Sequence, residues 1–301
     1  MKINRPKKDI VEIFGYAPND TTIDCRNQWR SGMCPFVPIP CVKRNHEQTV
    51  VYGTCSVTTP YGDCVICPNR LYFDNFKLLS VVSKDAFGEN VPFYTYAEYL
   101  KHKKSNGTFV VALGMHSGHE INLKNSFSMD WVLAKINNHK LDSYTGIEVQ
   151  SIDITGNYRD NWYAYKNIKE NSVIPKSEHG MNWANVHKRL IPQLIRKSMI
   201  YSRSKYVQSG LYFIVPDIVY KKFEDVIGAD IPLENHKGPN IMTVHTYALG
   251  EKVKEGEIRS IVPVRKLRFQ MEEFSRRFIS GPNLPQASEL DTAIIDALGL
   301  M

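Results

Sequence analysis

The sequence lacks several features that would assign it to a membrane, secreted or nucleotide-binding class. No apolar run approaches the roughly 20 residues that a membrane span needs, and the N-terminus, MKINRPKKDIVEIFGY, is charged where a signal peptide would be apolar. The chain also contains no Gly-rich phosphate loop, internal repeat or low-complexity tract. These absences predict a soluble, cytoplasmic protein without a membrane partner.

Cysteine is absent after residue 67, and all six cysteines lie in one N-terminal segment: Cys25, Cys34, Cys41, Cys55, Cys64 and Cys67. Without a signal peptide the compartment is reducing, which favours metal ligands over disulfides. Cys64 and Cys67 have the two-residue spacing of a metal knuckle, and turn formers flank the others. Four thiolates suit Zn²⁺ and iron equally well, and free buried cysteines are the alternative. We interpret the segment as a structural metal site that supports folding.

Length and charge narrow the class of protein further. A chain of 301 residues with 43% hydrophobic content can bury a sizeable core, as one large domain or as a domain with a small appendage. Acidic residues are outnumbered, 31 to 38, so the formal net charge is +7 and the pI is near 8.9. This excess of cations favours a polyanionic partner.

The most informative stretch is residues 127–158, FSMDWVLAKINNHKLDSYTGIEVQSIDITGNY. Two apolar runs, Phe127–Ile136 and Ile147–Ile154, are separated by turn-forming residues, which predicts consecutive strands. The alternation of a strand places Glu148 and Gln150 on one face and their apolar neighbours on the other. Asp130 lies on the first run. Two carboxylates and an amide at one sheet edge predict a hard-oxygen site that suits Mg²⁺.

Other interpretations of the acidic residues remain open at this point. Asp130 and Glu148 could be solvated residues of a half-exposed sheet, although their apolar neighbours argue against it. Glu120 precedes Asp130 by ten residues, close enough in sequence to share its site. His116 and His119 lie beside Glu120, but nothing nearby completes a tetrahedral set of ligands.

The remaining pattern predicts intermixed helices and strands. Residues 70–107 form a helical and polar connection, and Met181–Ser209 is a long helix that Pro192 kinks. One face of that helix is basic, and we expect it to be solvated or to neutralise phosphates; it carries Lys188, Arg189, Arg196, Lys197, Arg203 and Lys205. Further strands are expected at Thr108–Gly114, Leu211–Pro216, Ile241–Leu249 and Ile258–Val264, and helices at Val219–Ile227 and, basic and amphipathic, Arg265–Ile279. The predicted class is α/β or α+β with a mixed sheet.

Several motifs together resemble the NotI family of type II restriction endonucleases, a branch of the PD-(D/E)xK nuclease superfamily. The resemblance covers residues 32–223, through GMCPF (32–36), PCVK (40–43), GTC (53–55), CPNR (67–70), FSMDW (127–131), IEVQSIDITGNY (147–158), NVHKR (185–189) and FIVPDIVYKKF, which ends at Phe223. The family has glutamine where its superfamily usually has the lysine of Glu-x-Lys, and Gln150 stands at that position. The resemblance implies an active site of Asp130, Glu148 and Gln150, with Glu120 as an additional acidic residue.

The resemblance also implies partners and cofactors. A structural iron would be held by Cys34, Cys41, Cys55 and Cys67, in contrast to the spacing argument that selects Cys64 with Cys67. Residues 1–75 would form this four-cysteine knuckle, and residues 76–301 a restriction-endonuclease-like core with C-terminal DNA-contacting elements, the two together forming one compact domain. Asp130 and Glu148 would bind Mg²⁺ for cleavage of double-stranded DNA by a homodimer. The alternative is a DNA-binding protein that keeps the fold and has lost turnover.

Overall fold

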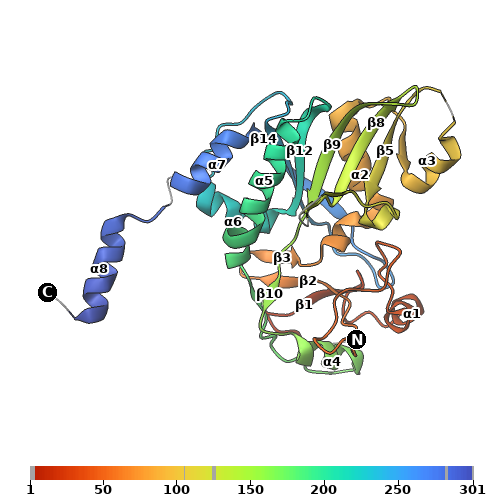
Figure 1. Ribbon diagram of the computed structural model, residues 1–301. Coiled ribbons are helices and arrows are strands. Elements are labelled where there is room, and N and C mark those ends of the chain that lie inside the picture. Colours follow the sequence, from red (N-terminus) through yellow and green to blue (C-terminus); the bar gives the residue numbers. More distant parts are fainter. Residues whose placement is uncertain (1–3, 105, 124–126, 282–283, 300–301) are drawn as a thin grey trace.

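The computed structural model describes residues 4–104, 106–123, 127–281 and 284–299 and is built on a mixed seven-stranded sheet (Figure 1). The strand order is β14-β13-β12-β9-β8-β5-β4. The pairs β4/β5, β9/β12 and β12/β13 are parallel, and β5/β8, β8/β9 and β13/β14 are antiparallel. The strands are β4 (Phe93–Thr95), β5 (Thr108–Gly114), β8 (Trp131–Asn137), β9 (Lys140–Val149), β12 (Val207–Pro216), β13 (Ile241–Leu249) and β14 (Ile261–Gln270). The expected mixed sheet is therefore confirmed.

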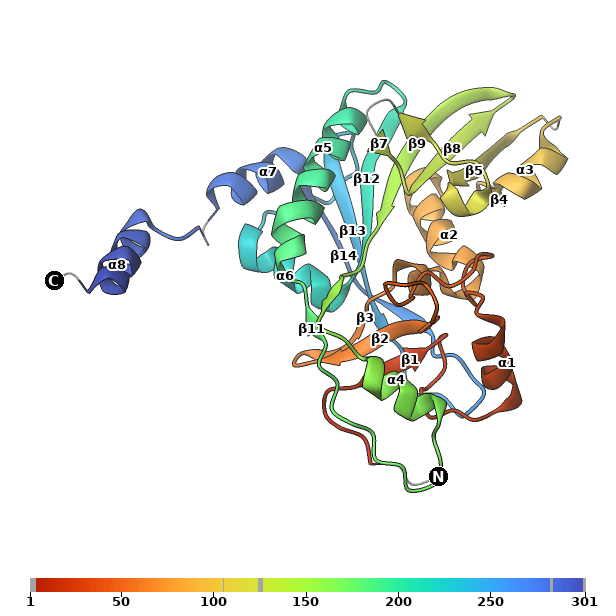
Figure 2. The ribbon, with the colours of Figure 1, turned by 60° about the horizontal axis from the view of Figure 1, so that its bottom comes forward.

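Helices cover both faces of this sheet (Figures 1 and 2). The helices are α1 (Ile23–Ser31), α2 (Phe73–Phe87), α3 (Tyr96–His102), α4 (Arg159–Lys166), α5 (Ile191–Ser202), α6 (Asp217–Ile227), α7 (Met271–Ser280) and α8 (Ala287–Leu298), with short helices η1 (Pro68–Tyr72), η2 (Met115–Ser117) and η3 (Val186–Leu190). Among the described residues, no helix is both long enough and apolar enough to span a membrane.

The alternation of side chains along the strands creates two apolar cores. On β12, Leu211, Phe213 and Val215 face one core, which α5, α6 and α7 cover, whereas Tyr212 and Ile214 face the other, which α2 covers. Both faces are buried because β12 lies in the middle of the sheet between two parallel neighbours. A polar side chain in this part of the sheet is therefore removed from water on either face.

An N-terminal sheet of three antiparallel strands packs against both cores. It consists of β1 (Ile10–Ile13), β2 (Thr54–Thr59) and β3 (Gly62–Val65). Ile10, Ile13 and Val57 contribute to the core under α5 and α6, and Cys55 and Val65 to the core under α2. Two-residue ladders, β6 (Asn122–Leu123) with β7 (Phe127–Ser128) and β10 (Ile154–Thr155) with β11 (Gly180–Met181), complete the strands.

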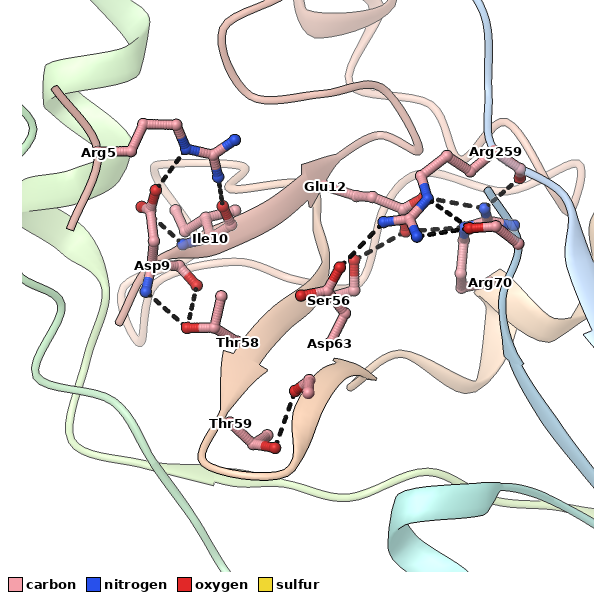
Figure 3. A network of polar contacts seen from close by, with 12 residues as sticks. Arg5, Asp9, Ile10, Glu12, Ser56, Thr58, Thr59, Asp63, Arg70 and Arg259 are labelled. Carbon is pink, nitrogen blue, oxygen red and sulfur yellow. Dashed lines mark hydrogen bonds and ion pairs between the residues drawn. The ribbon is translucent and has the colours of Figure 1, made fainter. Parts of the chain in front are cut away.

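A buried ion pair fixes this N-terminal sheet to the rest of the chain (Figure 3). Glu12 and Arg70 are fully buried, and Arg70 Nη2 and Nε lie 2.9 and 3.0 Å from the two oxygens of Glu12. Ser56 Oγ donates a further hydrogen bond to Glu12 at 2.8 Å, and Arg70 also donates to the backbone oxygen of Arg259. Two parallel charge-assisted bonds are among the strongest pairings available to a carboxylate.

Several predicted elements are confirmed and others are wrong in a consistent way. The strands predicted at Thr108–Gly114 and Ile241–Leu249 have the observed bounds, and the helix predicted at Val219–Ile227 begins two residues earlier. The helix predicted over Met181–Ser209 is shorter, because η3 precedes α5 and β12 already begins at Val207. Pro192 lies where η3, a π-helical turn, continues into α5, so the helical path changes its hydrogen-bond spacing just before this residue.

The predicted C-terminal helix Arg265–Ile279 is wrong in its first six residues, which continue β14 to Gln270. The cations of this segment are held by carboxylates from distant parts of the chain. Arg265 contacts Asp217 and Glu224, both at 2.6 Å, and Arg268 contacts Asp85 at 2.7 Å. Along a strand these side chains reach partners that a helix would not present to them. The segment is therefore not the free basic face expected from its composition.

Candidate active site

Asp130, Glu148 and Gln150 are brought together where β8 begins and β9 ends. Asp130 immediately precedes β8, Glu148 is the penultimate residue of β9, and Gln150 follows that strand. Trp131 pairs with Ile147 in the antiparallel ladder, so the next position outward places Asp130 beside Glu148. The predicted neighbourhood of the two carboxylates is thus present in the fold.

Glu148 points into the core on the α5 side of the sheet. Its neighbours Ile147 and Val149 face the opposite core, under α2, as the alternation of the sequence predicts. Glu148 is only 2% exposed, whereas Asp130 and Gln150 are half-buried. The solvated-sheet interpretation of Glu148 is therefore excluded.

Hydrogen bonds fix the orientation of Asp130. Its Oδ2 accepts from the backbone N–H of Val149 at 2.9 Å and from Nε2 of Gln150 at 3.3 Å. Gln150 in turn is anchored to the sheet, because its backbone N–H donates to the oxygen of Ile214 at 2.9 Å. The amide nitrogen of Gln150 faces the carboxylate, so this side chain acts on Asp130 as a neutral donor.

Lys197 of α5 supplies a positive charge that the sequence analysis did not assign to the site. Its Nζ forms an ion pair with Oε2 of Glu148, and the residue is only 8% exposed. Its placement on the solvated basic face of the helix was therefore wrong. The spacing contained a signal: Lys197 lies three residues after Leu194 and four before Tyr201, both buried, and so shares their stripe.

The carboxylates of Asp130 and Glu148 share one ammonium group, that of Lys197, and the pKa values of both carboxylates are raised. Burial, and then the charge of Asp130, raises the pKa of Glu148 to about 8, against the opposing effect of Lys197. Burial also raises the pKa of Asp130, again opposed by Lys197. Oε1 of Glu148 is buried without a donor at bonding geometry among the described residues. Near neutral pH the metal-free protein therefore holds a proton on Glu148, and a bound cation would replace this proton.

Two glycines allow bulky rings to close around this site. A Cβ at Gly146, on β9, would lie 2.0 Å from the ring of Tyr201. Tyr201 follows Lys197 by about one turn of α5. A Cβ at Gly114 would lie 2.6 Å from the Trp131 ring. Trp131 Nε1 donates to the hydroxyl of Tyr72 at 2.9 Å in the core below Asp130. These aromatic rings exclude water from the inner side of the carboxylates.

The outer side of the site opens into a cavity of about 150 Å³. Gln150 lines it, together with Asp153 and the two cations Lys43 and Arg189. Lys43 comes from the cysteine segment and Arg189 from η3, so elements far apart in sequence place positive charge beside Gln150. An anionic group that entered this cavity would meet both cations.

The remaining candidates around Asp130 are arranged differently from a metal triad. Glu120 is exposed, and His119 stacks on Tyr96 with ring centroids 4.6 Å apart. His116 packs edge-on against Tyr72 at 5.6 Å, and burial lowers its pKa despite the proximity of Asp130. The two histidines thus have separate aromatic partners.

The cysteines divide into a group of four and two outliers. After burial itself, the neighbouring Cys67 raises the pKa of the Cys55 thiol, and Cys67 has the same effect on Cys34 and Cys41. Cys67 is thus close enough to influence the other three thiols, Cys34, Cys41 and Cys55, electrostatically. Within the described ranges, however, no three His, Cys, Asp or Glu side chains have the spacing of ligands around one ion.

Cys64 and Cys25 lie apart from this group. Burial, and then Asp63, raises the pKa of Cys64 to about 12, and its thiol donates to the Val65 backbone oxygen at 3.5 Å. Cys25 lies on α1, where burial and Asp20 raise its pKa to about 11. The set of four that the family resemblance implies and the Cys64 and Cys67 pair selected by spacing therefore both stay predictions.

No protein-family model matches this chain, and no curated protein matches it either.

Proposed function

We propose that this protein is a Mg²⁺-dependent endonuclease of the type II restriction class, acting on double-stranded DNA. The observation that carries the proposal is the group of buried Glu148 and Lys197 with half-buried Asp130 and Gln150 at one end of β8 and β9. A carboxylate pair that its surroundings do not neutralise is costly unless a cation joins it. Such shifted carboxylates cluster at functional sites.

The elements around the site combine a mixed sheet with one helix on each face. In chain order, the main elements around the site are helix α2, strands β5, β8 and β9, helix α5 and strand β12. Strand β8 is antiparallel to both β5 and β9, and β12 is parallel to β9. Helices α2 and α5 lie on opposite faces of the sheet. The FSMDW and IEVQSIDITGNY motifs supply Asp130, Glu148 and Gln150 where β8 begins and β9 ends.

Each residue has a distinct role in the proposed reaction. Asp130 and Glu148 would hold Mg²⁺, whose chemistry here is to polarise a phosphate and to make water acidic enough to attack it. Gln150 orients Asp130 through its amide donor. Lys197 replaces the lysine missing from the Glu-x-Lys motif, because its ammonium reaches Glu148 from α5 and can offset charge on a scissile phosphate. Lys43 and Arg189 would attract the flanking phosphates.

The cysteine group has a structural role in this proposal. Cys34, Cys41, Cys55 and Cys67 would hold one iron or zinc ion, and soft thiolates suit both metals. The four thiols are buried or half-buried in one segment, and a bound cation would favour their thiolate forms, which burial disfavours. We further propose a homodimer, because cleavage of both strands at a palindromic site calls for two-fold symmetry.

The decisive experiment compares Glu148→Gln and Asp130→Asn with Asp142→Asn. Asp142 lies on β9 as well, but at its exposed end beside Lys135, so its substitution removes the same charge away from the site. With mixed plasmid DNA and Mg²⁺, we expect both site variants to lose about a thousandfold or more in cleavage rate, corresponding to about 4 kcal/mol, while DNA binding persists.

Sequencing the fragment ends of the wild-type digest would reveal the cut position. Cleavage by Glu148→Gln at the wild-type rate would overturn the assignment of the active site. DNA binding by a wild-type protein that never cleaves would instead support the alternative, a DNA-binding protein that has lost turnover.

A further inference from the structure

A second positively charged cavity lies away from the carboxylates, between α1, α4 and the cysteine segment. It has a volume of about 640 Å³, and its lining includes Arg26, Arg30, Arg44 and Lys166. No aspartate or glutamate of the described chain lines it, and neither do Asp130, Glu148 or Gln150. Both ribbon views place α1 and α4 at the end of the molecule formed by the β1–β3 sheet (Figures 1 and 2).

A stack of two indole rings forms the floor of this groove. The rings of Trp29 and Trp162 are 5.7 Å apart and inclined by 19°. Trp162 is buried and donates from Nε1 to the backbone oxygen of Tyr52 at 2.7 Å, so the stack is fixed to the fold. Since Trp29 comes from α1 and Trp162 from α4, the stack also joins the two helices that carry the cations.

The indole stack holds two of the cations in place without neutralising them. The guanidinium carbon of Arg26 lies 5.3 Å from the Trp29 ring centroid, and Nζ of Lys166 lies 5.1 Å from that of Trp162. Attraction to a ring face restricts where a cation sits but leaves its N–H donors available. Both donors are thus positioned before any ligand arrives.

The other two cations, Arg44 and Arg30, donate to neutral acceptors within the described part of the chain. Arg44 donates from Nε to the backbone oxygen of Cys41 at 3.0 Å, and Arg30 donates to the side-chain oxygen of Asn27 at 3.4 Å; both acceptors are neutral. By contrast, Arg265 and Arg268 on β14 contact carboxylates. Cations already paired with carboxylates have less to gain from a phosphate, so the α1–α4 groove is the better anion site.

We propose that this groove binds the phosphodiester backbone of double-stranded DNA. Four cations along one cavity without a carboxylate fit a polyanion. A duplex is favoured over a single strand because Trp162 and Arg26 already pack against the Trp29 ring, so an unpaired base would have to compete with them for stacking on it. This inference adds a second DNA contact to the proposed function and does not depend on cleavage.

The experiment removes the two cations that the indoles hold. Binding of a short duplex to the full chain would be measured without divalent metal across a range of salt concentrations for wild type and Arg26→Gln/Lys166→Gln. We expect the slope of log affinity against log salt to become less steep by about 1.8, since each phosphate contact contributes about 0.9. The charge-conserving variant Arg26→Lys/Lys166→Arg should retain most of the slope.

A charge-matched control separates this groove from a general effect of net charge. Lys103→Gln/Lys104→Gln removes two exposed charges beyond α3, and its slope should equal that of wild type. Melting temperatures would verify that each variant is folded. An unchanged slope in Arg26→Gln/Lys166→Gln, or an equal change in the control, would overturn the proposal.

Two further outcomes separate the ligands and the two proposals. Tighter binding of a single-stranded oligonucleotide than of the duplex, lost with the same substitutions, would overturn the assignment to duplex DNA. Wild-type protein that shows the groove-dependent slope but no Mg²⁺-dependent cleavage would refute only the nuclease proposal. Cleavage with no change of slope in the groove variant would refute only the groove.

Discussion

Two buried glutamates of this protein, Glu12 and Glu148, differ in how their carboxylate oxygens are hydrogen-bonded and in how their charge is balanced. Glu12, on β1, is fully buried, and both of its oxygens accept hydrogen bonds from Arg70, with Ser56 adding a third donor. Glu148, on β9, is 2% exposed; one oxygen faces Lys197 and the other is buried without a donor among the described residues. Burial alone therefore does not distinguish a structural carboxylate from a functional one.

The difference lies in the charge balance of the surroundings. Glu12 faces its own guanidinium, which lies over the Phe36 ring at 4.7 Å. Glu148 shares a single lysine with Asp130, and the second carboxylate raises its pKa. A balanced pair stabilises a fold, whereas a site with one carboxylate in excess is prepared for a cation from solution.

The largest loss of stability is expected from substitutions in the N-terminal cysteine segment, to which we assign a structural role. Metal binding contributes about 10–16 kcal/mol to folding in isolated zinc-finger peptides, so losing one ligand of four should cost more than any other substitution considered below. We expect Cys67→Ser to yield little folded protein and to lose bound metal. Cys64 lies on β3 and outside the group of four, so Cys64→Ser should keep its metal.

Elemental analysis with absorption spectroscopy would measure the metal content and distinguish red ferric iron from colourless zinc. Equal metal content and equal melting temperature for Cys67→Ser and Cys64→Ser would contradict the structural site. So would wild-type protein that is metal-free, fully folded and active.

The second prediction compares the same substitution, glutamate to glutamine, at positions 12 and 148. Glu12→Gln leaves Arg70 buried without a counter-charge, and breaking such a pair costs about 3–5 kcal/mol in the free energy of unfolding. Glu148→Gln leaves Lys197 with Asp130, one charge of each sign, so the metal-free protein should be as stable as wild type or more stable. Urea denaturation without metal would test both; a large loss of stability in Glu148→Gln would remove the distinction.

Whether the role of a residue can be predicted from the sequence depends on whether that role follows from a local pattern or from contacts with distant residues. Asp130, Glu148 and Gln150 were found because charges within apolar strand runs are conspicuous. Lys197 was missed because its role depends on the rotation of α5, which only the buried stripe through Leu194 and Tyr201 reveals. The Glu12–Arg70 pair joins residues 58 apart in sequence, and no local pattern connects them.

The end of β14 was missed for a related reason. A run rich in arginine resembles an amphipathic helix until its partners are known, and those partners, Asp85, Asp217 and Glu224, lie on α2 and α6. Local periodicity predicts which faces are apolar. It does not predict which distant carboxylate will fix a cation along a strand.

The third prediction uses the raised pKa of Glu148, about 8 against 4.5 for an ordinary glutamate. In this range of pH the folded, metal-free protein binds the proton more tightly than the unfolded chain does. The stability that neutral Glu148 contributes is therefore complete below about pH 4.5 and is lost as the pH rises towards 8. Glu148→Gln should flatten this decline in melting temperature, whereas Asp142→Asn should retain it.

The same proton must leave before Glu148 can hold Mg²⁺, so cleavage at limiting Mg²⁺ should increase with pH up to about 8. If the melting temperature of metal-free wild type and Glu148→Gln declined in parallel, the unbalanced charge at this site would be refuted.

The smallest loss of cleavage activity is expected for substitutions of Gln150. Its amide contributes one hydrogen bond to Asp130, worth about 0.5–1.5 kcal/mol, so Gln150→Met should slow cleavage by no more than about tenfold. Gln150→Lys restores the Glu-x-Lys motif and places a second ammonium beside the carboxylates, which should weaken Mg²⁺ binding but preserve turnover at high Mg²⁺.

The informative variant moves the lysine from the helix to the strand. Lys197→Met alone should lose most activity, because two carboxylates then remain without an ammonium and the charge on the phosphate is no longer offset. Adding Gln150→Lys returns one cation to the same site from β9, so the double variant should cleave faster than Lys197→Met. Rates across a range of Mg²⁺ concentrations would separate metal affinity from turnover. A double variant no faster than Lys197→Met would show that Lys197 acts through its position on α5 and not through its charge.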